Sequence, residues 1–241
     1  VSGIIAGVRN NGVGMNGAAD KVKIMAIRNT PNGDEYDKDV ALGVYYAVNN
    51  GAKIINMSFG KSFSPHSDWV RDAIAYAAKR DVLIVAAAGN NSENTDKKQY
   101  YPNDQLGTGV EVSDTFIKVG SSTNEHSSDI VSSFSNYGKI TVDLFSPGSR
   151  IYSTTPENEY RFLQGTSMAS PLVAGVAALV MSQYPKLSAA EVKEVLMNSG
   201  LPLNLEISLG EDSVVPFSGL SKSGKLVNAY NALIMASKVS K

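Results

Sequence analysis

The sequence contains no cysteine among its 241 residues. A disulfide framework, a thiolate nucleophile and a cysteine-ligated metal site are therefore excluded. An excess of charge is also missing, because the formal net charge at pH 7 is -1 and acidic and basic residues are scattered along the chain. A surface with balanced charge does not attract polyanions, so we expect no nucleic-acid partner and no anionic membrane partner.

Long apolar runs are absent as well. The longest one, residues 172–181, is about half of the roughly 20 residues that a membrane-spanning helix requires. We therefore expect a soluble chain. A chain of this length can bury a substantial core, and it shows no internal repeat, low-complexity tract or linker. The simplest organisation is one domain that covers residues 1–241.

Short β-branched and apolar runs alternate with segments of helical periodicity. These runs are apolar at nearly every position, as is typical of a parallel sheet with helices on both faces. The sequence therefore predicts an α/β fold with three layers and a mostly parallel central sheet. The expected strands are Lys23–Ile27, Lys53–Met57, Val82–Ala87, Phe116–Val119 and Val142–Phe145.

Three helices are expected from periodicity and end signals. The first covers the apolar positions of residues 40–48, and Gly51 lies where a C-terminal cap is expected. The second starts at Ser64-Pro65. The third is preceded by Ser188, with a glutamate three residues later, which is a capping box. Its expected end is Gly200.

The segment Gly165–Pro171 reads GTSMASP and continues into the apolar run LVAGVAALVM. Gly165 permits a tight turn, and proline suits the first turn of a helix. Ser167 is then expected at a helix N-terminus, where unpaired N–H groups and the helix dipole favour a developing negative charge. The segment alone does not decide between a nucleophilic serine and a serine or threonine that only caps a buried helix, which is the commoner case for such a segment.

The extended segment GTSMASPLVAG resembles the nucleophile segment of the subtilisin-like serine proteases, the subtilases. Three further stretches match that family in order: INMSFG at 55–60, VAAAGN at 85–90, and SFSNYG with VDLFSPG before the serine. The first residues, VSGIIAG, resemble the stretch just after the family's catalytic histidine. The resemblance covers essentially the whole chain and implies the three-layer subtilisin-like fold.

This resemblance implies a serine endopeptidase that hydrolyses peptide bonds through an acyl-enzyme. It assigns the nucleophile to Ser167 and a donor of the oxyanion hole to Asn90, whose side-chain amide would bind the developing oxyanion. A peptide or protein substrate would bind as an added strand. The implied substrate-binding residues are Ser58, Phe59 and Gly60 along the substrate backbone, and Ala87, Ala88 and Gly89 in a wall of the primary specificity pocket.

The same resemblance implies two features near this pocket. Tyr100 is a further implied substrate-binding residue, and it stands where relatives often have a glycine, which leaves the size of the pocket open. The Tyr101-Pro102 bond is expected to be cis, because X-Pro is the position where a cis peptide bond costs least.

The resemblance also implies that the chain starts just after the catalytic histidine, with the catalytic aspartate still further upstream. His66 and His126 are the only histidines, neither lies in a family histidine motif, and both are expected at the surface. We therefore expect this chain alone to be inactive, with an open sheet edge where a first strand is missing. A pro-segment or the N-terminal segment is an expected partner.

No cofactor or metal site is assigned to this chain. The loop VRNNGVGMNG at 8–17 resembles the family's calcium loop, with carbonyls of Arg9, Val13 and Met15 and the Asn11 side chain as ligands. Relatives take the remaining ligands from their N-terminal part, so calcium is expected only in a full-length protein. Relatives are usually exported, which implies an extracellular or periplasmic location.

Two other functions compete with a protease. A subtilase relative that has lost catalysis would act as a peptide- or protein-binding module. The glycines of 12–17 also outline a G-x-G-x-x-G dinucleotide fingerprint. That fingerprint must open a helix, and too few residues separate Gly17 from the strand expected at Lys23.

Overall fold

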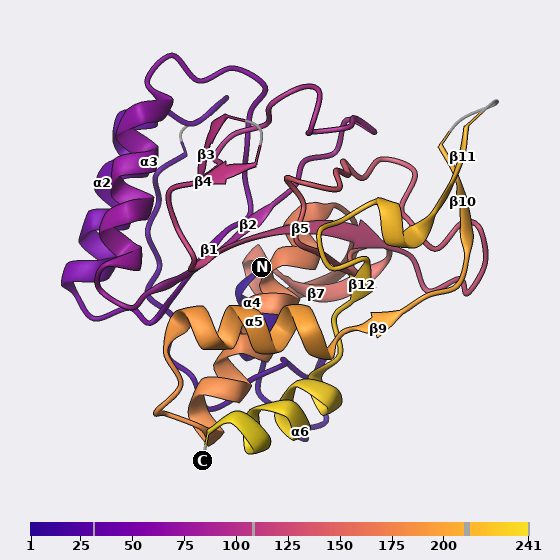
Figure 1. Cartoon of the computed structure of the whole chain (residues 1–241). Coiled ribbons are helices and arrows are strands. Elements are labelled where there is room, and N and C mark those ends of the chain that lie inside the picture. The colour runs from indigo at the N-terminus through magenta and orange to yellow at the C-terminus, as the bar shows by residue number, and fades with distance from the viewer. Residues whose placement is uncertain (31, 108, 210–212, 241) are drawn as a thin grey trace.

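The computed structural model describes residues 1–30, 32–107, 109–209 and 213–240 (Figure 1). Its six-stranded sheet has the order β1-β2-β5-β6-β12-β9. Neighbouring strands are parallel from β1 to β12, and only β9 pairs antiparallel. The strands are β1 (Ile54–Met57), β2 (Leu83–Ala87), β5 (Phe116–Ser122), β6 (Leu144–Pro147), β12 (Lys225–Leu226) and β9 (Leu201–Pro202). The predicted α/β class with a mostly parallel sheet is confirmed.

Six α-helices and three short antiparallel ribbons lie around this sheet in the described part of the chain. The helices are α1 (Ser2–Ala6), α2 (Asp37–Asn49), α3 (Ser67–Ala78), α4 (Thr166–Gln183), α5 (Ala189–Ser199) and α6 (Ala229–Val239). The ribbons are β3 (Gln105–Gly107) with β4 (Val110–Glu111), β7 (Ile151–Thr155) with β8 (Glu159–Leu163), and β10 (Glu206–Ser208) with β11 (Val214–Pro216).

The two faces of the sheet carry separate cores. Leu83 and Val85 of β2 pack in one core with residues of α4, α5 and α6. Ile84 and Ala86 pack in another with residues of α2 and α3. Since successive side chains of a strand point to opposite faces, the two helix groups cover opposite sides of the sheet. Figure 1 shows the α2–α3 pair apart from the α4–α6 group, with the sheet between them. The three predicted layers are present.

Helix α4 is the central helix of the first core. By length and composition it could cross a membrane, but 67% of its apolar window is buried inside the protein. Its residues pack against β2, β5 and β6 and against α5 and α6. A helix that is apolar on all sides fits such an interior position, so its hydrophobicity is explained by the core.

Four of the five predicted strands form within a few residues of their expected bounds, but the strand predicted at Lys23–Ile27 is wrong. Residues 23–30 make no backbone-backbone hydrogen bond with any residue that the structure describes. A strand requires a neighbouring backbone, and this segment has none. It is separated from the edge strand β1 by a groove of about 1190 Å³. Ile24 and Met25 remain 45% and 41% exposed there.

Of the four predicted helix ends, three are confirmed and one is shifted. Gly51 follows the end of α2 with φ 84°, the conformation typical of a glycine at a helix C-terminus. Ser188 and Glu191 form the reciprocal capping box before α5, and Gly200 follows that helix. Helix α3 begins at Ser67 rather than at Ser64-Pro65. The reason is that the Ser64 hydroxyl donates to the Asp37 carboxylate (2.7 Å) and does not cap the helix. The Tyr101-Pro102 peptide bond is cis, as predicted.

Candidate active site

Ser167 is the second residue of α4, at the helix N-terminus predicted from the sequence. Pro171, however, lies inside the helix and not in its first turn. Since proline has no N–H, it cannot donate to the carbonyl four residues earlier, which is that of Ser167. The Ser58 hydroxyl donates to this carbonyl instead, at 2.9 Å. The proline therefore frees the nucleophile candidate's carbonyl for a contact with the sheet.

The Ser167 side chain is half-buried and lies beside the end of β1. Its hydroxyl donates to the carbonyl of Ser58 at 3.0 Å. The Ser58 hydroxyl also accepts from the Asn56 amide at 2.8 Å and lies 3.0 Å from the Ser170 hydroxyl. The serine is thus held against the carboxyl end of the sheet and is not sealed in the interior.

Asn90 follows β2 and is fixed by Thr166, the residue before Ser167. Its side-chain oxygen accepts from the backbone N–H and from the hydroxyl of Thr166, both at 2.9 Å. The Thr166 hydroxyl in turn accepts from the Gly89 N–H at 3.1 Å. Because the oxygen is bound on this side, the orientation of the Asn90 amide is determined.

Two N–H donors remain unused next to each other. In the described part of the chain, neither Nδ2 of Asn90 nor the backbone N–H of Ser167 donates a hydrogen bond. A Cβ atom placed on Gly165 would lie 3.4 Å from the first nitrogen and 3.6 Å from the second. Gly165 has φ 142°, a conformation that favours glycine, so this space stays open. Such a pair of donors can bind an anionic oxygen.

Both histidines lie at the surface, as predicted. The His66 ring stacks on Trp69 with 4.1 Å between ring centroids, and its backbone N–H donates to Asp37. His126 is exposed. Among the described residues, no hydrogen bond joins either histidine to Ser167. These two side chains do not provide a base for the serine.

The substrate-binding residues predicted from the sequence continue two neighbouring strands. Ser58, Phe59 and Gly60 follow β1, and the segment 87–89 continues β2, its parallel neighbour. Their positions beside Ser167 and Thr166 are fixed by the hydrogen bonds of Ser58 and Gly89 described above. The structure therefore brings the two predicted segments to one edge of the sheet, next to the serine.

Tyr100 lies between these two segments. Its Cε1 atom is 2.5 Å from the position that a Cβ on Gly60 would take, and 2.7 Å from the corresponding position at Gly89. The ring thus contacts both glycines across the space that separates the strand ends. Burial raises the pKa of its phenol, and the nearby acidic Glu35, Asp34 and Glu93 add to this shift.

A buried charge cluster beneath Tyr100 was not predicted from the sequence. Lys118 of β5 is 2% exposed and donates from Nζ to the carbonyls of Tyr100 (2.5 Å) and Pro102 (2.9 Å). Burial lowers its pKa to about 8, against the opposing effect of Asp104 and Asp143. Burial raises the pKa of Asp104 to about 7, with nearby Glu111 and Asp143 as further causes. The signal for this cluster was a lysine inside an otherwise apolar strand.

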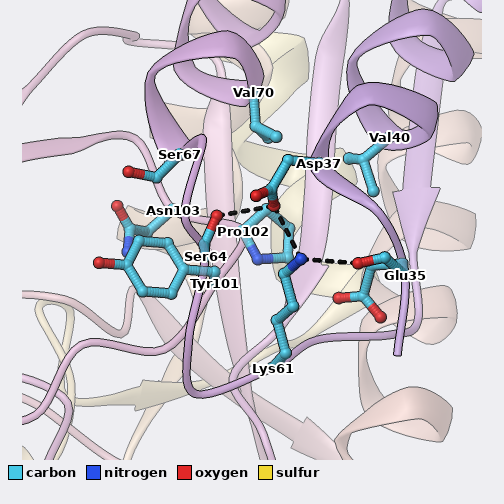
Figure 2. A pocket seen from close by; sticks show the side chains of 10 residues that line it. All are labelled: Glu35, Asp37, Val40, Lys61, Ser64, Ser67, Val70, Tyr101, Pro102 and Asn103. Atoms are coloured by element: carbon cyan, nitrogen blue, oxygen red, sulfur yellow. Dashed lines mark hydrogen bonds and ion pairs between the residues drawn. The ribbon is translucent and has the colours of Figure 1, made fainter. Parts of the chain in front are cut away.

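A second polar cluster adjoins Gly60 (Figure 2). Lys61 donates to the Glu35 carbonyl at 2.6 Å and lies 2.8 Å from the Asp37 carboxylate. Burial alone would raise the pKa of Asp37, but hydrogen bonds from Lys61, Ser64 and the His66 backbone outweigh it and lower this pKa. The ion pair is almost fully buried and leaves a cavity of only about 10 Å³. This cluster, too, was not predicted.

The calcium ligands that the resemblance implies in the loop at 8–17 are three backbone carbonyls and the Asn11 side chain. Among the residues with described positions, no group of three His, Cys, Asp or Glu side chains could hold a metal ion. The Asn11 side-chain oxygen accepts from the Val13 N–H at 3.0 Å. No helix follows Gly17 in residues 18–30, so the dinucleotide fingerprint lacks the helix that it requires.

Comparisons with known proteins give one consistent result. The profile of the subtilase family matches residues 1–223. Thermitase from Thermoactinomyces vulgaris is 37% identical over 199 residues, which cover 82% of this chain and 64% of thermitase. The cell wall-associated protease of Bacillus subtilis is 36% identical over 216 residues, which cover 89% of this chain and 22% of that protein. The chain thus spans less than two thirds of the length of these curated relatives.

Solved structures agree with the sequence matches. A protease from Pseudoalteromonas arctica has a TM-score of 0.78 and 27% identity, covering 97% of this chain and 68% of that one. A cold-adapted subtilisin-like serine proteinase has a TM-score of 0.68 and 30% identity, covering 82% and 67%. With the family profile matching nearly the whole chain, this protein belongs to the subtilase family of serine proteases.

Proposed function

We propose that this chain is the nucleophile-bearing part of a serine endopeptidase. Ser167 attacks the carbonyl of a peptide bond, and the N–H groups of Asn90 Nδ2 and Ser167 bind the oxyanion that forms. The observation that carries the proposal is the unused pair of donors beside a reachable hydroxyl. Stabilisation of the oxyanion is often the largest single contribution to such catalysis.

The chemical step requires a base that His66 and His126 do not supply. In the proposed reaction, the Ser167 oxygen bonds to the carbonyl carbon while its proton passes to an imidazole. That imidazole then protonates the leaving amine, and water hydrolyses the acyl-enzyme. We place the imidazole and the carboxylate that orients it in a part of the whole protein outside these 241 residues, so this chain alone is inactive.

The open edge of the sheet supports a partner for the chain. Strand β1 pairs only with β2, and the facing segment 23–29 pairs with nothing described. The groove between them is lined by apolar residues, among them Ile24, Met25 and Ile54. An added strand would provide hydrogen-bond partners for the backbones on both sides of the groove and would cover this apolar surface. We assign this place to the N-terminal segment of the whole protein; a pro-segment is the other candidate partner.

The proposed substrate is a peptide or protein that binds as an extended strand. Backbone groups of Ser58, Phe59 and Gly60 pair with the residues before the scissile bond, and Ala87, Ala88 and Gly89 form the facing wall. This mode gives affinity with little dependence on sequence. We propose a location outside the cytoplasm, for which the relative named cell wall-associated protease is the support.

A labelling experiment tests the proposal. The full-length protein, this chain alone and the full-length Ser167→Ala variant are treated with a fluorophosphonate probe and assayed on casein. Labelling and hydrolysis are expected only for the first. Ser182→Ala, near the other end of the same helix, serves as the matched control and should still be labelled.

Two outcomes would contradict the proposal. Efficient labelling of Ser167 in this chain alone would show that no added imidazole is needed. A folded full-length protein that is neither labelled nor active, yet binds casein peptides, would instead favour a peptide-binding module that has lost catalysis.

A further inference from the structure

We propose that Tyr100 limits the substrate residue before the scissile bond to a small side chain, glycine or alanine. This inference rests on the proposed function and specifies its substrate class.

The position of the scissile carbonyl determines where that side chain must go. The carbonyl carbon must lie next to Ser167 Oγ, with its oxygen near Asn90 Nδ2 and Ser167 N. Ser58 contacts Ser167 on one side, and Gly89 contacts Thr166 on the other. A side chain attached beside this carbonyl therefore enters the space between the segments 58–60 and 87–89.

The Tyr100 ring already occupies this space. A methyl carbon on Gly60 would lie 2.5 Å from its Cε1, and one on Gly89 would lie 2.7 Å from both Cε1 and Cζ. Real carbon atoms do not approach so closely, so the ring leaves no room for a single added carbon at either wall. An aromatic substrate side chain would need the volume that this ring fills.

The backbone around Tyr100 is anchored on both sides, so the ring cannot move away with its loop. The Tyr100 carbonyl accepts from Lys118 Nζ (2.5 Å) and from the Asn103 amide (3.2 Å). The next residue, Tyr101, forms two backbone hydrogen bonds with Lys61, each 2.9 Å long. Displacing the ring therefore requires rotation of its own side chain against both glycine walls.

The test uses the full-length protein and two peptides that differ only in the residue before the scissile bond, alanine or phenylalanine. We expect kcat/KM to favour alanine by about 100-fold or more. Tyr100→Ala should raise kcat/KM for the phenylalanine peptide at least about tenfold relative to the alanine peptide. Tyr100→Phe keeps the ring and should keep the preference.

A control variant and the wild-type kcat/KM values for the two peptides separate a failure of this inference from a failure of the proposed function. Tyr230→Ala removes a tyrosine that is 73% exposed on α6 and should change neither value. If the wild-type protein cleaves both peptides equally well, the inference about Tyr100 is wrong while the proposed protease stands. If the full-length protein cleaves neither peptide and the fluorophosphonate does not label it, the proposed function itself fails.

Discussion

Ser58 and Ser167 are joined by two reciprocal hydrogen bonds, in which the hydroxyl of each donates to the carbonyl of the other. The distances are 2.9 Å to the Ser167 carbonyl and 3.0 Å to the Ser58 carbonyl. This arrangement depends on Pro171, which leaves the Ser167 carbonyl without its helical partner. The start of α4 is therefore tied to the end of β1, the strand proposed to bind substrate.

Ser58→Ala should make the position of Ser167 less fixed while the nucleophilic hydroxyl itself is kept. The Ser167 carbonyl would lose its donor, and the loss of one such hydrogen bond costs about 1 kcal/mol. We expect kcat/KM of the full-length enzyme to fall about 5- to 10-fold, mainly in kcat, as a positioning role implies. Ser182→Ala, at the far end of the same helix, is the control. An unchanged kcat would refute the positioning role of Ser58.

Among the side chains of this chain, the Asn90 amide should contribute most to stabilisation of the oxyanion. Asn90→Asp keeps the oxygen that accepts from Thr166 but replaces the amide donor, so kcat is expected to fall about 100- to 1000-fold. Thr166→Val removes the hydroxyl that orients the amide and should give a smaller loss. Steady-state kinetics on one peptide measure both. Equal activity of Asn90→Asp and wild type would exclude the proposed oxyanion hole.

Gly165→Ala should block the same space. The added methyl would stand beside both donors, at a φ of 142° that non-glycine residues rarely adopt. We expect loss of catalysis together with a lower unfolding temperature, because the strain is present without substrate. Gly107→Ala, where an added carbon has no atom of the described residues within 4 Å apart from its chain neighbours, is the control for the stability change. A Gly165→Ala enzyme with wild-type kcat would contradict this geometry.

Sequence patterns predicted the sheet because its strands are apolar on both faces, and they predicted α5 because Ser188 and Glu191 cap it locally. The segment 23–27 has the same apolar character but no backbone partner among the described residues, and a strand ladder depends on a partner that local sequence does not contain. Motif resemblance placed Ser167 and Asn90 near each other. It also placed Tyr100 at the specificity pocket but left the size of that pocket open, because the contact of the ring with Gly60 and Gly89 joins residues far apart in the chain. The Lys61–Asp37 pair could not be predicted for the same reason.

Asp37→Asn should destabilise the fold. The substitution leaves Lys61 buried without its charged partner, and breaking such a pair costs about 3 kcal/mol. Since the pKa of Asp37 is lowered in the folded state, its contribution is present above the unfolded pKa and is lost as pH falls below about 4. The free energy of unfolding in urea should be much lower for the variant than for wild type at pH 7. At pH 3 the two values should be close. Asp39→Asn, a half-buried position on the same helix, is the control.

Asp104→Asn should have the opposite effect on stability at neutral pH. The folded-state pKa of about 7 lies above the unfolded value near 4, so the folded protein binds more protons across this range and loses stability as pH rises through it. The asparagine variant lacks this loss and should be more stable by about 1–3 kcal/mol at pH 7.5, with little difference at pH 4. Thermal unfolding of both proteins across this range measures the effect. A variant that is less stable than wild type at pH 7.5 would show that the Asp104 carboxylate is needed to compensate Lys118.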